Sequence, residues 1–169
     1  TAESGVGIVY APRTGDILSM ACYPSFNPQE GANVPAELRR NRSITDPVEP
    51  GSTFKPFIAS GALAAKAITP QEKFDCGNGT HFFGARKITD THPHGVMDLK
   101  GVIAKSSNIG MTYIAERLGN KRLRETIRSF GFGEMTGVEL PGENAGVVYP
   151  LSFWNSWTTP SVAMGYEIG

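Results

Sequence analysis

The residues of this chain best suited to chemistry lie in residues 49–57, Glu-Pro-Gly-Ser-Thr-Phe-Lys-Pro-Phe. Ser52 and Lys55 are three positions apart, so on a helix both side chains would lie on one face, about 5–6 Å apart at Cβ. A serine hydroxyl is a weak nucleophile until a neighbouring base takes its proton, and a lysine partly removed from water can be that base. The spacing therefore indicates a Ser–Lys catalytic pair. Taken alone, so short a motif is better explained by an N-cap serine followed by a solvated lysine.

The sequence around this pair predicts the helix that would position it. Pro50-Gly51 is typical of a turn and residues 58–65 are rich in good helix formers, so we expect a helix to begin at or just after Ser52. Pro56 fits this start because the first amides of a helix have no intrahelical partner to lose. The positive end of the helix dipole would then favour an oxyanion that develops near Ser52.

A second polar group, Ser106-Ser107-Asn108, separates two predicted helices at residues 99–105 and 109–118. A break between helices can point a hydroxyl and an amide into a cleft. Ser106 would then relay a proton between a lysine and a leaving amine, and Asn108 would hydrogen-bond the lysine or a substrate amide. Serine and asparagine are also preferred N-caps, and the triplet by itself is explained as a cap.

The order of the remaining elements predicts the fold class. Residues 7–11 and 16–22 are apolar strand candidates joined by a turn, and a long polar connection follows at residues 23–49. We expect α/β content, with helices packed on an antiparallel sheet that has further strands outside this chain. The other predicted elements are a helical stretch at 35–42, short strands at 80–83 and 86–89, a cap at Asp98, a helix end at Gly119, a helix through Leu123, Ile127 and Phe130 that ends at Gly131, and a short aromatic helix within 153–163 through Trp154 and Trp157.

Composition excludes several classes of protein. The 169 residues are 40% hydrophobic, enough for one core, and 16 basic residues balance 16 acidic ones, so nothing suggests nucleic acid or anionic lipid as a partner. No apolar run could span a bilayer and no signal peptide opens the chain. Cys22 and Cys76 allow either one disulfide or two free thiols. His81, His92 and His94 lack metal-site spacing, so we predict no metal site from them.

The two motifs taken together resemble the penicillin-binding proteins, the D,D-transpeptidases that cross-link bacterial cell-wall peptidoglycan. Pro-Gly-Ser-Thr-Phe-Lys-Pro at residues 50–56 is followed by Ser-Ser-Asn-Ile-Gly at 106–110, each at a predicted helix start. Within this family, the chain resembles the monofunctional class B branch, of the cell-division type. It extends over nearly the whole chain and includes residues 11–21, 23–28, 40–46, 130–143 and 163–166.

This resemblance implies a penicillin-binding transpeptidase or serine β-lactamase-like fold and a role for each motif residue. Ser52 would be the acylated nucleophile and Lys55 its general base. Ser106 and Asn108 would form the second motif, with Ser107 as its variable middle residue.

The family's third motif, Lys-Thr/Ser-Gly, lies on a strand after the second motif and lines the substrate carboxylate. Residues 13–15, Arg-Thr-Gly, precede Ser52, and residues 135–137, Met-Thr-Gly, lack the cation, so we reject both. We therefore expect residues 1–169 to be the N-terminal portion of a single transpeptidase domain. The C-terminal strands, with half of the oxyanion hole, would lie outside it.

The implied reaction is acyl transfer, for which no metal or organic cofactor is expected. Ser52 would attack the carbonyl of a stem peptide ending in D-Ala-D-Ala, and an amine of a neighbouring stem peptide would resolve the acyl-enzyme. β-Lactams would inhibit it, and proteins of cell-wall synthesis would be its partners. The expected location is the periplasmic or extracytoplasmic face of the bacterial inner membrane, with an anchor outside this chain. The alternatives are a non-catalytic penicillin sensor or cell-wall scaffold on the same fold, a serine β-lactamase, and a carboxypeptidase.

Overall fold

The computed structural model describes residues 2–169, and its elements fall into two compact units. The first unit comprises residues 2–47 and 137–144, and the second comprises residues 48–136 and 145–169. In the described residues, no helix has the length and apolar character that crossing a membrane would need. Both cysteines are free thiols, so of the two alternatives for Cys22 and Cys76 the disulfide is wrong.

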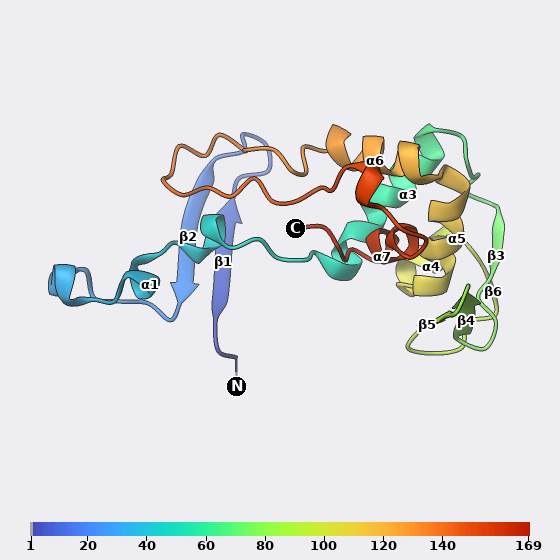
Figure 1. Ribbon diagram of the computed structural model, residues 1–169, viewed down its shortest axis with the longest axis horizontal. Coiled ribbons are helices and arrows are strands. Elements are labelled where there is room, and N and C mark those ends of the chain that lie inside the picture. The colour runs from blue at the N-terminus through green and yellow to red at the C-terminus, as the bar shows by residue number, and fades with distance from the viewer. Residues whose placement is uncertain (1) are drawn as a thin grey trace. The chain divides into compact units, whose positions relative to one another are not determined.

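The first unit is built on the predicted hairpin, which the structure confirms. Strands β1 (Gly5–Tyr10) and β2 (Ile17–Tyr23) pair antiparallel, and the turn between them is closed by the Ala11 N–H, which donates to the Asp16 carbonyl at 2.8 Å (Figure 1). The polar connection after β2 contains a 3-10 helix (Pro28–Asn33) and the short helices α1 (Ala36–Arg39) and α2 (Arg42–Thr45).

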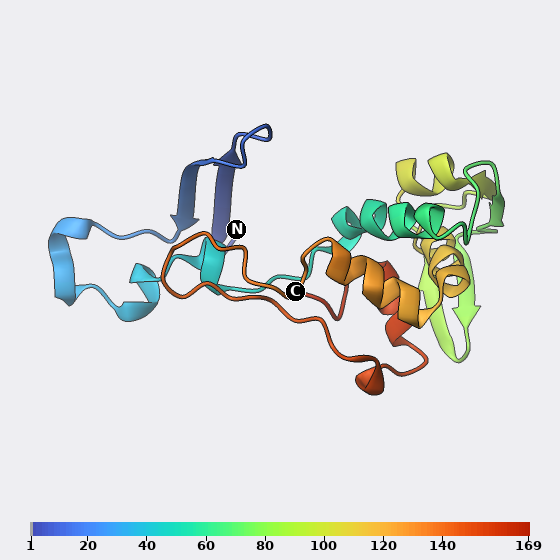
Figure 2. The same cartoon turned by 90° about the horizontal axis from the view of Figure 1, so that it is seen from above.

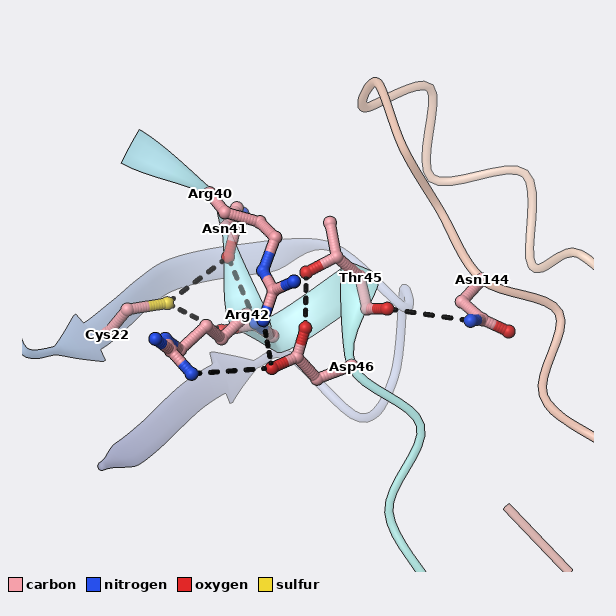
Figure 3. A network of polar contacts seen from close by, with 8 residues as sticks. Cys22, Arg40, Asn41, Arg42, Thr45, Asp46 and Asn144 are labelled. Atoms are coloured by element: carbon pink, nitrogen blue, oxygen red, sulfur yellow. Dashed lines mark hydrogen bonds and ion pairs between the residues drawn. The ribbon is translucent and has the colours of Figure 1, made fainter. Parts of the chain in front are cut away.

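A polar network fixes α2 against the hairpin within this unit. Arg40 and Arg42 both reach the Asp46 carboxylate, at 2.9 and 3.6 Å, and Asn41 caps α2 by accepting from a backbone amide. The thiol of Cys22 lies 3.3 Å from the Asn41 side-chain oxygen, which links β2 to the same network (Figure 3). Exposed ion pairs contribute little individually, so shared contacts of this kind are what hold such short helices in place.

The second unit is a helical bundle with two small antiparallel sheets. Helix α3 (Lys55–Ala64) packs on α5 (Asn108–Leu118) and α6 (Asn120–Ser129), and α5 also packs on α7 (Thr158–Ala163) (Figures 1 and 2). Helix α4 (Leu99–Ala104) precedes α5. The two-stranded sheets pair β3 (Lys73–Asp75) with β6 (Val96–Asp98), and β4 (Thr80–Phe83) with β5 (Arg86–Thr89).

The core of this unit explains why these helices form. The apolar positions of α6 recur at helical spacing, so Leu123 and Ile127 are buried while Arg122 and Glu125 on other faces of the helix are exposed. Helix α5 is buried nearly all round, with Met111 and Ile114 fully enclosed, and Gly119 ends it as predicted. Its neighbour α4 begins at the predicted Asp98 cap, whose side chain accepts the Gly101 N–H at 2.9 Å.

Two details of the predicted elements are corrected. The predicted aromatic helix does not include its tryptophans, because α7 begins after Trp157 and only a 3-10 turn (Leu151–Phe153) precedes Trp154. The Asn155 side chain accepts the Trp157 N–H at 2.7 Å, which makes a local turn at the place where a helix was expected. The β3–β6 pair was not predicted.

Candidate active site

The turn that presents Ser52 has the geometry its sequence predicts. A single 3-10 turn (Gly51–Phe54) leads directly into α3, with Gly51 at φ +56°, and Pro56 occupies the first turn of the helix. Phe54 is fully buried and packs edge-on to Phe132 with ring centroids 4.9 Å apart. With Phe54 packed in this way, Ser52 is exposed, whereas Lys55, the residue after Phe54, is buried.

Lys55 lies in a polar cradle formed by the break between α4 and α5. Its Nζ donates to the Ser106 carbonyl at 2.6 Å, to Ser106 Oγ at 3.1 Å and to Asn108 Oδ1 at 2.7 Å. Ser106 has a left-handed backbone at φ +54°, uncommon for a residue with a side chain. Three acceptors match the three N–H donors of a lysine ammonium, so the cradle fixes the direction of the amine.

Burial changes the acidity of this amine. The Lys55 side chain is 2% exposed, and loss of water lowers its pKa from 10.5 to about 8, against the opposing attraction of the Asp90 carboxylate. About one-tenth of the amine is then neutral at pH 7, compared with less than a thousandth for a lysine in water. The site therefore supplies a lysine that can accept a proton near neutral pH.

A cavity of about 340 Å³ gathers the predicted residues. Ser52, Ser106 and Asn108 line it together with Thr89, Asp90 and Thr91. The structure thus brings Lys55, Ser106 and Asn108 together by hydrogen bonds and places Ser52 on the wall of the same cavity. The catalytic roles assigned to these four residues stay predictions.

The last residue of β5, Thr89, and the residue after it, Asp90, belong to the site but were not predicted from the sequence. The Thr89 carbonyl accepts the Asn108 Nδ2–H at 2.9 Å, and the Asp90 carboxylate accepts the Asn108 backbone N–H at 2.6 Å. The signal available was a polar triplet, Thr-Asp-Thr at residues 89–91, which begins at the last residue of the predicted strand 86–89. Its link to Asn108 spans 18 residues and has no local signature.

Hydrogen bonds with residues 165–167 also hold the turn before Ser52. The Gly51 N–H donates to the Gly165 carbonyl at 3.0 Å, and Glu49 Oε1 accepts the Glu167 N–H at 2.8 Å. Gly165 has φ +85°, and a Cβ there would overlap the Gly51 carbonyl oxygen. Only glycine fits this close approach of two backbones.

The three histidines for which no metal site was predicted are not among the residues that line this cavity. His81 Nδ1 lies 3.1 Å from the Tyr113 hydroxyl. Across the part of the chain that the structure describes, no group of three or more His, Cys, Asp or Glu residues has the arrangement of a metal site.

Comparison with known proteins gives one consistent family. Residues 5–169 match the family described as penicillin binding protein transpeptidase domain. The chain is 35% identical over 167 residues to a probable peptidoglycan D,D-transpeptidase PbpC of Pseudomonas aeruginosa, covering 99% of this chain and 30% of that protein. It is 33% identical over 167 residues to peptidoglycan D,D-transpeptidase FtsI of Escherichia coli, covering 99% of this chain and 28% of that one.

The fold is similar to a solved transpeptidase domain. The TP domain of Burkholderia pseudomallei penicillin-binding protein 3 superposes with a TM-score of 0.85 at 34% identity, over 99% of this chain and 46% of that chain. The chain spans about 30% of the length of the curated relatives it matches and about half of the solved chain. The predicted fold class, helices with antiparallel sheet in a partial transpeptidase domain, is confirmed.

Proposed function

The chain belongs to the penicillin-binding protein transpeptidase family, and from this premise we propose that it is the N-terminal portion of a peptidoglycan D,D-transpeptidase domain. The protein that contains it cross-links stem peptides ending in D-Ala-D-Ala through an acyl-enzyme on Ser52. The observation that carries the proposal is Lys55, a buried amine of lowered pKa held by Ser106 and Asn108 beside the cavity that Ser52 lines. Identity to FtsI favours the class B, cell-division type.

In the proposed reaction, neutral Lys55 takes the Ser52 proton as the serine oxygen attacks the carbonyl carbon of the penultimate D-alanine. The tetrahedral intermediate collapses, its bond to the terminal D-alanine breaks, and the leaving amine receives a proton. Ser106 supports this transfer because its hydroxyl lies 3.1 Å from the lysine amine and also lines the cavity. An amine of a second stem peptide then attacks the ester and restores Ser52.

The same site would be acylated by β-lactams, and the scheme needs no metal or organic cofactor. The protein that contains this chain would act at the extracytoplasmic face of the bacterial inner membrane, where its peptidoglycan substrate lies. Other proteins of cell-wall synthesis are the expected partners.

The lining of the cavity disfavours the β-lactamase alternative. Deacylation by water needs a base with a free lone pair near the ester. Among the described residues that line the cavity, Asp90 is the only one with a carboxylate, and its oxygens accept three hydrogen bonds from residues 107–109, which direct the carboxylate toward the N-terminus of α5. A stable acyl-enzyme is therefore the expected outcome with a penicillin.

The test is covalent labelling of the full-length protein that contains this chain with a fluorescent penicillin. We expect stable labelling that Ser52→Ala abolishes and Ser60→Ala leaves intact, since Ser60 is an exposed serine of α3. Absence of labelling in the folded protein would contradict the proposal, and rapid drug hydrolysis would indicate a β-lactamase.

Labelling alone does not separate an enzyme from a sensor. Cross-linking of a pentapeptide substrate by the same protein distinguishes them, because a sensor binds the drug without forming the cross-link. Stable labelling without cross-linking of bound stem peptide would overturn the transpeptidase assignment in favour of the sensor.

A further inference from the structure

The carboxylate of Asp90 holds the first turn of α5 from outside that helix. Its Oδ1 accepts the backbone N–H groups of Asn108 at 2.6 Å and Ile109 at 3.2 Å. Its Oδ2 accepts the hydroxyl of Ser107 at 2.6 Å. Ser107 itself caps the helix by accepting the Gly110 N–H at 2.9 Å. The first three amides of α5 are thus all satisfied by two side chains, one of them from Asp90, the residue after β5.

This arrangement controls Asn108 twice. Asp90 fixes its backbone, and the neighbouring Thr89 carbonyl fixes the orientation of its side-chain amide by accepting Nδ2–H at 2.9 Å. With Nδ2 committed to Thr89, the amide must present Oδ1 to Lys55, which it meets at 2.7 Å. The segment Thr89-Asp90 therefore determines which atom of Asn108 faces the lysine.

We infer that Asp90 is a positioning residue for acyl transfer, acting on Lys55 through the first turn of α5 and through its own negative charge. The inference rests on the proposed function for its catalytic meaning. It assigns to Asp90 a role that neither the Ser-x-x-Lys nor the Ser-Ser-Asn motif contains.

The charges around Lys55 support this role. The groups that hold the amine are neutral: Ser106, from the break between α4 and α5, and Asn108, the first residue of α5. Asp90, from the segment after β5, is the charged group that raises the Lys55 pKa, while burial on the α3 side lowers it. A negative charge at this place in the half-buried site favours the ammonium form and also stabilises the N-terminus of α5.

A simple helix cap is the competing explanation, and two variants separate it from positioning. Asp90→Asn keeps the shape and leaves one oxygen to accept the Asn108 and Ile109 amides, but removes the charge. Ser107→Ala removes the cap hydroxyl and its bond to Asp90 while leaving the carboxylate charge and both backbone contacts in place. A role limited to capping predicts similar behaviour of the two variants.

The direct experiment is an NMR titration of Lys55 in the full-length protein. Lysine labelled with ¹³C at Cε gives the resonance, and Lys55→Arg assigns it. We expect Asp90→Asn to lower the midpoint by about half to one pH unit, because an opposite charge has been removed. We expect Ser107→Ala to leave the midpoint within about 0.2 unit, since that variant keeps the charge. Melting curves of both variants verify that they fold.

Acylation by fluorescent penicillin adds the functional readout. The pH midpoint of the acylation rate should move with the Lys55 midpoint in Asp90→Asn. Its plateau should fall about tenfold or more, because a neutral oxygen accepts the Asn108 and Ile109 amides more weakly and holds Asn108, and with it the amine, less firmly. An unchanged Lys55 midpoint in folded Asp90→Asn, or an equal shift in Ser107→Ala, would overturn the inference. If the unmodified protein is not labelled by penicillin, the proposed function fails, and the titration still decides whether Asp90 sets the state of Lys55.

Discussion

The backbone carbonyl oxygen of Ser106 lies 2.6 Å from Nζ of Lys55, closer than the Ser106 hydroxyl at 3.1 Å. Ser106 thus accepts hydrogen bonds from the lysine amine through its main chain as well as its side chain. Its left-handed backbone, at φ +54°, accompanies this double contact. Such a conformation in a residue other than glycine costs about 1 kcal/mol or more, which is the kind of local strain found at functional sites.

Substitutions of Ser106 should therefore separate activity from stability. Ser106→Ala and Ser106→Gly both lose the hydroxyl, and each should slow acylation about 100-fold. Only glycine relieves the backbone strain, so Ser106→Gly should be more stable than Ser106→Ala by about 1 kcal/mol. Urea unfolding of the two variants checks the difference. Equal stabilities would mean that the left-handed backbone carries no strain.

Lys55 should make stability rise with pH in an alkaline window. Its pKa is about 8 in the folded protein and 10.5 without burial. Between these values the unfolded chain binds the proton that the folded protein has released, so unfolding becomes less favourable as pH increases. The full effect is about 3 kcal/mol. The measurement is the free energy of unfolding of the protein minus that of Lys55→Met from pH 7 to 11. Lys87→Met, at an exposed position, is the control: it keeps Lys55 and should show the same rise of stability with pH as the unmodified protein.

Asn108→Asp should shift the acylation profile toward higher pH. The new carboxylate would lie where Oδ1 now meets the lysine amine at 2.7 Å, and a negative charge there raises the Lys55 pKa. We expect the midpoint of the acylation rate to rise by about one pH unit or more. Asn155→Asp makes the same change outside the cavity, and a shift of equal size there would argue against a local effect.

Gly165→Ala should damage both stability and the position of Ser52. An added Cβ would overlap the Gly51 carbonyl, so the loss of stability should reach about 3 kcal/mol, with slower acylation. Gly131→Ala is a matched control, because Gly131 also has φ +85° but its Cβ would meet no atom within 4 Å. It should lose only about 1 kcal/mol and keep its acylation rate. Thermal unfolding with penicillin labelling measures both effects, and indistinguishable variants would contradict the proposed close approach.

Phe54→Ala should remove the anchor beneath the Ser52 turn. Phe54 is fully buried against Phe132, so its truncation should lower the free energy of unfolding by about 3–5 kcal/mol. Phe153→Ala removes an aromatic ring that is 73% exposed and should change it by no more than about 0.5 kcal/mol. Chemical denaturation gives both values. A loss below about 1 kcal/mol in Phe54→Ala would show that the turn does not depend on this ring.

Features that depend on neighbouring residues could be predicted from the sequence. The hairpin of β1 and β2, the strands β4 and β5 and the cap at Asp98 all follow from local turn, alternation and capping patterns, and the structure has them. The turn before Lys55 belongs to the same class, because Pro50-Gly51 and Pro56 specify it within a few residues.

Features that depend on distant residues could not. Strands β3 and β6 have three residues each, which is too short to show an alternation of apolar and polar residues. They are also far apart in sequence, so no hairpin turn joins them. The contact of Lys55 with Ser106 joins residues 51 positions apart, and only the paired motifs suggested it. Asp90 had no such motif. The tryptophans at 154 and 157 have apolar side chains that suit a helix, but the Asn155 side chain stabilises a turn between them.

Each compact unit happens to carry a single sulfhydryl, and the two differ in access to reagent. Cys22 in the first unit is half-exposed, whereas Cys76 in the second is enclosed behind Ser107, 3.3 Å from its hydroxyl. A thiol-modifying dye should therefore react faster with Cys22, and with Cys76 only during transient opening of the second unit. The rate at which Cys76 is modified thus reports how often the structure next to Ser107 opens, without any engineered probe.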